Sequence, residues 1–174
     1  MFFMEINERI PLNKTKIYLD TSVISYLEQD DAPEQMLITR EVWETFKSGK
    51  YDIYISNVVL RELSNCKDEN KRTKLLNHLS EIKYSFIDVT EKTMEFAERI
   101  IDLGILKKKS FDDCQHIAAA IVGNCDFIIS WNFKHIVNIE TIRGLKVLTT
   151  SEGYKDILIY SPEAFQSDKE EEND

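Results

Sequence analysis

Residues 107–120 read KKKSFDDCQHIAAA, three lysines followed by two adjacent carboxylates and then by small apolar residues. Ser110 is the expected N-cap of a helix, and Asp112 and Asp113 fall in its first turn, where free backbone N–H groups and the helix dipole favour negative charge. One face of that helix follows the spacing i, i+3, i+4, i+7: Asp113, His116, Ile117 and Ala120. The stretch predicts a helix packed closely on a sheet, with a carboxylate at its N-terminal end. Taken alone, an acidic first turn is also explained if the two carboxylates only stabilise the helix and have no catalytic or binding role.

The bulk composition is that of an ordinary globular protein. The 174 residues are 43% apolar and 30% charged, which suits one domain with a sizeable core, predicted here to span residues 1–166. The cysteines are odd in number and lack a CxxC spacing (Cys66, Cys114 and Cys125), which argues against a disulfide framework or a zinc site. Residues 1–12 show neither a basic leader nor a long apolar run. The expected location is therefore the cytoplasm, with no membrane contact.

Charge is unevenly distributed along the chain. The formal net charge is −9, from 31 acidic and 22 basic residues, and residues 163–174 alone contain six acids and one base. We predict that residues 167–174 form an acidic, disordered tail, since they have nothing to bury. An acidic protein is a poor general binder of polyanions, so any nucleic-acid role must depend on local basic patches such as Lys107–Lys109.

Short apolar runs alternate with amphipathic helical patterns through the whole chain. Strands are predicted at 16–19, 51–55, 84–89, 126–130 and 145–148. Helices are predicted at 33–47, 58–63, 68–83, 91–103 and 111–122, with short ones at 139–143 and 161–165. This alternation is typical of a three-layer α/β/α fold with a central parallel sheet of four to five strands.

Three acidic residues take equivalent positions in that fold. Asp20 follows the first strand, Glu62 lies in the helix after the second, and Asp113 opens the helix that leads to the fourth strand. Asp112 takes the place of Asp113 in this set of acids if the register of the helix is shifted by one residue. The carboxyl ends of parallel strands share one edge of the sheet, so these acids are expected in one crevice, where their mutual repulsion calls for a cation. A few hard oxygen ligands with room for water suit Mg²⁺ or Mn²⁺, which activate water for attack on a phosphodiester. No Walker loop, GxGxxG or GxSxG motif is present.

Four segments in this order resemble the PIN-domain family. They are YLDTSVI at 18–24, VLREL at 59–63, DDCQHIAAA at 112–120 and CDFIISWN at 125–132. The resemblance runs from Lys16 to Leu148 and implies a metal-dependent ribonuclease acting on RNA. The family includes the VapC-type toxins, so the resemblance also implies a small antitoxin partner and a homodimer.

The resemblance assigns roles to particular residues. Asp20, Glu62 and Asp113 match the metal-binding acids of the family, whereas Asn132 stands where the family often has a fourth acid. An amide oxygen coordinates a cation without contributing charge, which would weaken a second metal site.

Residues around these acids are candidates for contact with RNA. Lys109 and His135 are expected to reach phosphate. The hydroxyls of Thr21, Ser22 and Ser130 are substrate-binding candidates, with helix capping and orientation of neighbours as the alternative role. His116 is expected to be a packed, hydrogen-bonded histidine, and Trp131 and Phe133 either stack on a base or belong to the core.

Two other functions compete with the nuclease. The first is a PIN-like module that binds RNA or a protein without cutting it, which Asn132 and the acidic balance favour. The second is a receiver-like signalling domain, which requires a lysine directly after a late strand, and Lys134 matches that position poorly. Metal binding distinguishes the nuclease from the module, because a scaffold does not need to keep three acids that hold a cation.

Overall fold

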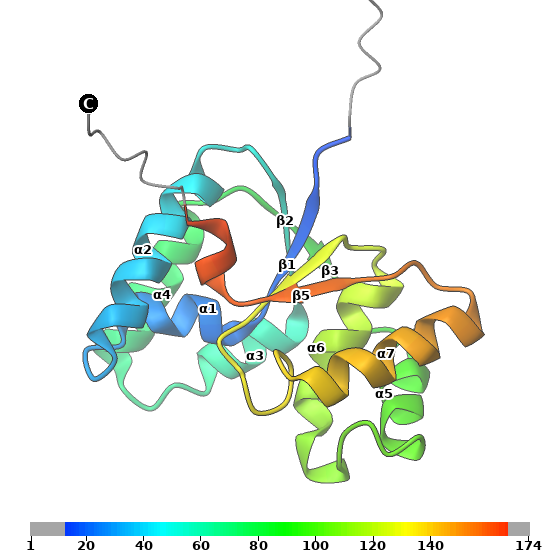
Figure 1. Ribbon diagram of the computed structural model, residues 1–174. Helices are drawn as coiled ribbons and strands as arrows, with labels where there is room; N and C mark the ends of the chain where they lie inside the picture. The colour runs from blue at the N-terminus through cyan, green and yellow to red at the C-terminus, as the bar shows by residue number, and fades with distance from the viewer. Residues whose placement is uncertain (1–12, 167–174) are drawn as a thin grey trace, which may run out of the picture.

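The computed structural model describes residues 13–166, and within this range five parallel strands form one sheet in the order β3-β2-β1-β4-β5 (Figure 1). The strands are β1 (Lys16–Leu19), β2 (Asp52–Ser56), β3 (Tyr84–Ile87), β4 (Phe127–Ile129) and β5 (Leu158–Tyr160). The α/β class and the parallel sheet predicted from the sequence are confirmed.

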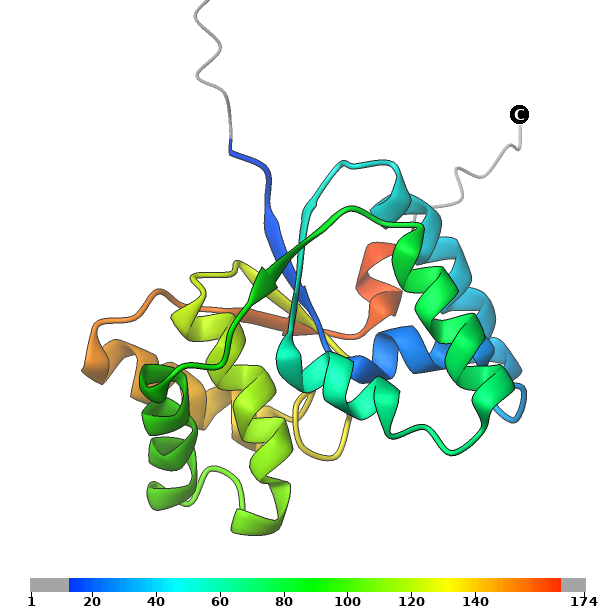
Figure 2. The same ribbon diagram turned by 180° about the vertical axis from the view of Figure 1, so that it is seen from behind.

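Helices cover both faces of this sheet. In Figures 1 and 2, α1, α2 and α4 lie on one side, and α5, α6 and α7 lie on the other. The helices are α1 (Thr21–Ser25), α2 (Pro33–Lys47), α3 (Asn57–Ser64), α4 (Glu69–Ser80), α5 (Glu91–Asp102), α6 (Phe111–Val122) and α7 (Ile139–Glu152). Single 3₁₀ turns are η1 (Tyr26–Glu28), η2 (Lys108–Ser110) and η3 (Pro162–Phe165), the last at the short helix predicted for 161–165.

The central strand β1 determines where the chemistry can take place. Ile17, Tyr18 and Leu19 are fully buried, as expected for a strand covered on both faces. The chain pairs β2 on one side of β1 and later returns to pair β4 on the other side. Such a reversal of strand order leaves a crevice at the carboxyl ends of the two strands. Asp20 and Ser130 directly follow β1 and β4 and therefore lie at this crevice.

The predicted fifth strand at 145–148 is wrong, because these residues belong to α7. Leu145 and Leu148 are buried while Val147 is 69% exposed, a helical spacing rather than a strand alternation. A four-residue run with three apolar side chains does not distinguish the two structures, and the edge strand is β5 (Leu158–Tyr160), further along the chain.

Helix α4 also differs from its prediction. It ends at Ser80 rather than at residue 83; Leu75 and Leu79 are buried, and Leu76 is exposed because it lies outside the stripe that faces the core. His78 pairs through Nε2 with Glu28 Oε1 at 2.7 Å, since η1 packs beside α4.

Two substitutions test the assignment of residues 145–148 to helix α7. Gly153 adopts a left-handed φ of 73° at the helix C-terminus, and no heavy atom lies within 4 Å of the position a Cβ would take. We expect Gly153→Ala to lower the free energy of unfolding by about 1 kcal/mol through backbone strain alone. Val147→Ala should change it by less than about 0.5 kcal/mol, because the side chain is exposed and alanine favours helix. Urea unfolding of both variants checks this, and a clear loss for Val147→Ala would contradict the helix.

Some of the sequence predictions concern residues outside the described range. Residues 1–12 of the predicted domain and the predicted acidic tail at 167–174 are in this group, so the domain boundaries stay predictions. Within residues 13–166, no helix combines the length and apolar character needed to cross a membrane.

Candidate active site

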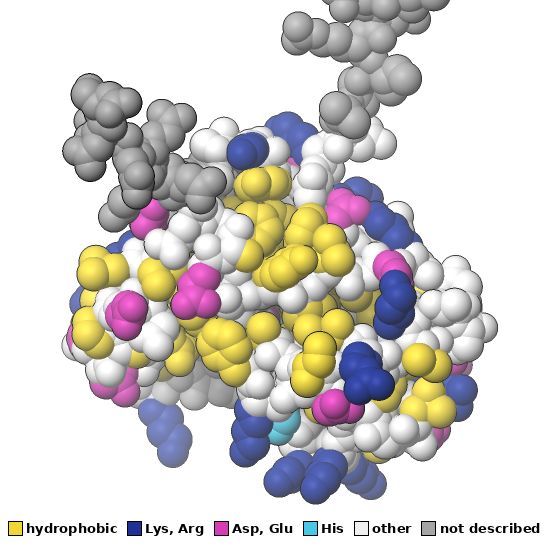
Figure 3. All heavy atoms as spheres, viewed as in Figure 1, with side chains coloured by type: hydrophobic (Ala, Val, Ile, Leu, Met, Phe, Trp, Pro, Cys, Tyr) yellow, Lys and Arg dark blue, Asp and Glu magenta, His cyan; other side chains and the backbone are white. Residues whose placement is uncertain are grey.

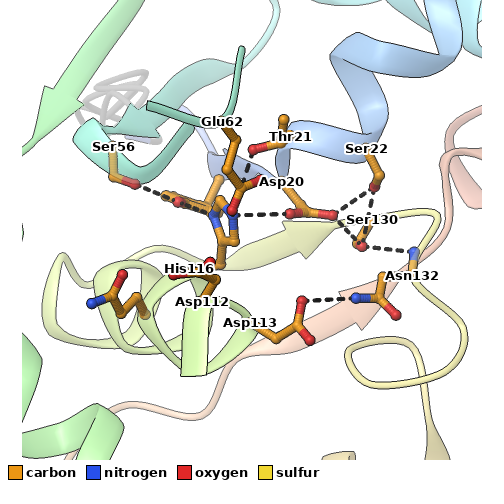
Figure 4. Close-up of polar contacts among 12 residues, drawn as sticks. Asp20, Thr21, Ser22, Ser56, Glu62, Asp112, Asp113, His116, Ser130 and Asn132 are labelled. Carbon is orange, nitrogen blue, oxygen red and sulfur yellow. Dashed lines mark hydrogen bonds and ion pairs between the residues drawn. The ribbon is translucent and has the colours of Figure 1, made fainter. Parts of the chain in front are cut away.

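Asp20 is the most firmly held of the candidate acids. It is 4% exposed, and its Oδ2 accepts hydrogen bonds from Ser22 Oγ at 2.6 Å and Ser130 Oγ at 2.7 Å. Ser22 Oγ also accepts from the backbone N–H of Trp131, which ties α1 to the end of β4. Figure 4 shows the two hydroxyls on one side of the carboxylate and His116 on the other. The hydroxyls thus orient Asp20, and neither Thr21 nor Ser22 caps α1 through its side chain.

A buried histidine joins Asp20 to Glu62. His116 Nε2 lies 3.0 Å from Glu62 Oε1 and 3.4 Å from Asp20 Oδ1, so two acids from different elements meet the same nitrogen. His116 Nδ1 is 2.8 Å from the Tyr18 hydroxyl, which is 2.7 Å from Ser56 Oγ. Thr21 Oγ1 also approaches His116 Nε2, at 3.5 Å. The expected packed, hydrogen-bonded histidine is present.

These contacts shift the ionisation of both groups. Burial acts to lower the pKa of His116, but the charges of Asp20 and Glu62 outweigh it, and the pKa is raised. Burial acts to raise the pKa of Glu62, yet the hydrogen bond and charge of His116 outweigh it, and the pKa is lowered. The site therefore favours an anionic Glu62 beside a histidine with strengthened basicity.

Asp113 lies at the start of α6 and faces the loop after β4. Its Oδ1 accepts a 2.9 Å hydrogen bond from Asn132 Nδ2, and its Oδ2 lies 2.7 Å from His135 Nδ1. Asn132 Oδ1 accepts from the backbone N–H of His135, so the three residues hold one another. Burial raises the pKa of Asp113 and the negative charge of Asp20 adds to this effect, while His135 opposes it. Asp113 is thus near enough to Asp20 for their charges to interact.

Asp112 is not part of this group. Its side chain is mostly exposed and pairs with Arg61 Nη2 at 2.7 Å, on the outer side of α6. The same Arg61 nitrogen donates to Gln115 Oε1 at 3.1 Å. The register of α6 therefore directs Asp113, rather than Asp112, toward Asp20.

Comparisons with known proteins agree with this geometry. The model of the PIN domain family matches residues 17–150, which is most of the chain. The chain belongs to the PIN-domain family. A solved structure, VapBC2 from Rickettsia felis bound to a DNA fragment from their promoter, is 17% identical with a TM-score of 0.53. The match covers 84% of this chain and 98% of that one, and at this identity it shows a shared fold. No curated protein matches the sequence.

PIN domains are typically nucleases and usually depend on a metal, so the fit of this PIN domain to a cation has to be considered. Within residues 13–166, no three acidic, histidine or cysteine side chains stand ready to hold one ion together. Mg²⁺ usually keeps several waters and binds through only one or two carboxylates. Asp20 and Glu62 share a histidine nitrogen, and the Asp113 carboxylate is influenced by the charge of Asp20. This set of oxygen donors fits a hydrated Mg²⁺ or Mn²⁺.

The remaining predicted contacts lie around the rim of the PIN-domain site. Lys109 is exposed in η2, directly before α6, and His135 is partly exposed beside Asp113. Ser110 does not cap α6 as expected, because the 3₁₀ turn before the helix gives it a φ of −103° and a ψ of 29°. Its hydroxyl instead approaches the His135 ring at 3.4 Å. Burial raises the pKa of the Cys114 thiol to about 12, so this neighbour of Asp113 is no nucleophile.

Sequence reasoning missed the residues that support the acids from behind. Tyr18 and Ser56 come from β1 and β2 and hold His116, which contacts Asp20 and Glu62; Tyr18 lies in the YLDTSVI segment, but the sequence assigned neither residue a role. One signal was available: a tyrosine in an otherwise aliphatic central strand needs a partner for its hydroxyl. His116 and Ser56 are those partners.

Proposed function

We propose that this PIN domain is a metal-dependent ribonuclease that hydrolyses RNA phosphodiester bonds. The observation that supports the proposal is that Asp20 and Glu62, from separate parts of the chain, both approach Nε2 of His116, which lies on the same helix α6 as Asp113. In the proposal these carboxylates hold Mg²⁺ or Mn²⁺, and Asn132 assists through its amide. The bound cation would lower the pKa of a water and offset negative charge at the phosphorus.

Each residue then has a defined task. Asp20 is held through Oδ2 by two serine hydroxyls, and its Oδ1 lies 3.4 Å from His116 Nε2. His116 keeps Glu62 ionised and oriented. Asn132 and His135 orient the Asp113 carboxylate, which would be one of the oxygen ligands of the cation. No covalent intermediate on the protein is required.

Substrate contacts follow from the same geometry. Lys109 and His135 are the proposed phosphate contacts, since both reach solvent at the rim of the site. Thr21, Ser22 and Ser130 remain candidates, but the hydroxyls of Ser22 and Ser130 already serve Asp20. For either serine to contact RNA, its hydroxyl would have to stop donating its hydrogen bond to Asp20.

A role as the toxin of a toxin–antitoxin pair is part of the proposal. Its support is the family and the fold shared with VapBC2. We accordingly propose a small antitoxin partner, a homodimer and a cytoplasmic location. The alternative function is a non-catalytic module that binds RNA or protein, favoured by one observation: both oxygens of Asp113 are engaged by Asn132 and His135.

Removal of the metal tests the proposal. Fluorophore-labelled, mixed-sequence RNA is incubated with the purified protein in Mn²⁺, in Mg²⁺ and in excess EDTA, while Mn²⁺ binding is followed by calorimetry. We expect cleavage with either ion and a loss of at least about 100-fold in EDTA, because charge stabilisation by a metal contributes several kcal/mol. Mn²⁺ binding without cleavage of any RNA would contradict the ribonuclease, and absence of Mn²⁺ binding would overturn the three-acid site and favour the module.

A further inference from the structure

The loop after β4 places one large apolar ring in solvent next to the candidate site. Phe133 is 51% exposed and directly follows Asn132, which bonds Asp113. Its neighbour Trp131 is buried, stacks on Tyr26 at 5.5 Å between ring centroids, and donates from Nε1 to Thr39 Oγ1 at 2.8 Å. The two aromatic residues therefore differ in role: Trp131 anchors the loop, and Phe133 is left facing outward.

The exposed ring is held in place. Phe133 N–H donates to Trp131 O at 3.0 Å, and the Phe133 ring meets the Trp131 ring edge-on at 6.0 Å between centroids. The loop is further fixed by hydrogen bonds from the backbone N–H groups of Ile136 and Val137 to Asn132 O. A rigid aromatic ring loses little conformational freedom on binding, which makes it an effective contact surface.

Exposed lysines occur in the same loop as this ring and in the segment directly before α6. Lys134 follows Phe133 and is exposed. Lys107–Lys109 are exposed directly before α6, and the contact between Asp113 and His135 joins the start of α6 to the loop that carries Phe133. Figure 3 shows lysine and arginine side chains gathered along the lower edge of the molecule, beside a histidine. In Figure 1 the same edge carries the β4–α7 loop and the start of α6. This edge therefore offers several basic side chains, although the protein as a whole is acidic.

An exposed aromatic ring beside lysines is the combination that binds single-stranded nucleic acid, where an unpaired base offers its face and the backbone its charge. A duplex hides those faces inside its own stack. We infer that Phe133 is a base-stacking residue that selects single-stranded RNA, with Lys134 and Lys107–Lys109 on the flanking phosphates. The inference rests on the proposed function for its substrate class, but it concerns binding and not cleavage.

The test measures binding in EDTA at low salt, so that no cleavage is required. The probe is a single-stranded RNA carrying 2-aminopurine, whose fluorescence reports stacking, compared with the same sequence as a duplex. We expect Phe133→Ala to weaken single-strand binding by about 5- to 100-fold and to abolish the 2-aminopurine signal, with the weaker duplex binding unchanged. Phe133→Tyr should retain both properties, a rescue that a merely structural role would not predict.

Another exposed phenylalanine, far from this loop, provides a matched control. Phe86 is 44% exposed on the edge strand β3, which β2 and β1 separate from β4. Phe86→Ala removes an equally exposed ring and should leave RNA binding unchanged. Unaltered single-strand affinity in Phe133→Ala would overturn the inference and leave the ring free for a protein partner, even if the wild type cleaves RNA. If the wild type cleaves no RNA but Phe133→Ala still weakens single-strand binding, the base-stacking role of Phe133 stands and the nuclease proposal fails.

Discussion

Asp20→Asn is expected to reduce RNA cleavage by roughly 10²–10³-fold or more while leaving the fold intact, since removal of one preorganised charge at a reaction centre commonly has that effect. Asp20 is almost fully buried and fixed by Ser22 and Ser130, so the protein cannot readily substitute another oxygen. Mn²⁺ affinity should fall in parallel, because the amide contributes no charge. Cleavage and calorimetric titration of the same samples measure both effects.

The same substitution should not destabilise the protein. In the absence of a cation, Asp20 repels Asp113 strongly enough to contribute to the raised pKa of that carboxyl. Removing this charge relieves the repulsion but also removes a charge that faces His116, so we expect a melting temperature in EDTA close to that of the wild type. Lost activity without lost stability is the signature of a functional acid and not of a structural one.

Asp126→Asn is the matched control for this experiment. Asp126 directly precedes β4, at the opposite end of the strand from the crevice, where it pairs with Lys155 and accepts from the backbone N–H of Lys16 at 2.7 Å. Its loss should leave cleavage within about twofold of the wild type and lower stability by no more than about 1 kcal/mol, as for other exposed pairs. Equal activity losses in both variants, or full activity in Asp20→Asn, would contradict the assigned site.

The sequence predicted the fold where physical signals were unambiguous. Residues 17–19 of β1 and all three residues of β4 are apolar, as buried parallel strands require. The run LKVL at 145–148 is mostly apolar but too short to exclude a helix, and only its packing shows that Leu145 and Leu148 share a helical face. Local pattern therefore identified the sheet, whereas the end of the fold depended on tertiary contacts.

The candidate site was predictable to a similar extent. Strand order and the rule that ligands bind at the carboxyl edge bring Asp20, Glu62 and Asp113 together from sequence alone. Their supporting contacts were not predictable, because Tyr18 and His116 are 98 residues apart and meet only in the folded chain. The hydrogen bond between Asn132 and Asp113 likewise depends on how the β4–α7 loop turns back onto α6.

That hydrogen bond leads to the second prediction with a large expected effect, for the variant Asn132→Asp. Asn132 Nδ2 now donates to Asp113 Oδ1 at 2.9 Å, and an aspartate would replace this donor with a second negative oxygen. The existing bond from His135 N–H to Asn132 Oδ1 can persist, so the loop keeps its shape. In EDTA we expect a loss of about 1–3 kcal/mol of stability from the unpaired acceptor and the like-charge contact.

A bound cation should offset at least part of this loss of stability. If position 132 faces the ion, a further carboxylate strengthens binding, and an increase of about tenfold in Mn²⁺ affinity corresponds to about 1.4 kcal/mol. Because an ion that binds only the native state stabilises it, the rise in melting temperature on adding Mn²⁺ should be larger in Asn132→Asp than in the wild type. Cleavage should rise with it wherever metal occupancy limits the rate.

Asn138→Asp separates this effect from any general consequence of adding a charge. Asn138 caps α7 by accepting from the backbone N–H of Glu140 at 3.0 Å, and aspartate performs the same role equally well. This control should match the wild type in EDTA and in Mn²⁺. If Asn132→Asp also shows the wild-type response to Mn²⁺, the amide at 132 serves only to hold Asp113, and the cation is bound by Asp20, Glu62 and Asp113 without it. A larger response in Asn132→Asp alone would mean that the amide has reduced metal affinity at a site whose other acids remain in place.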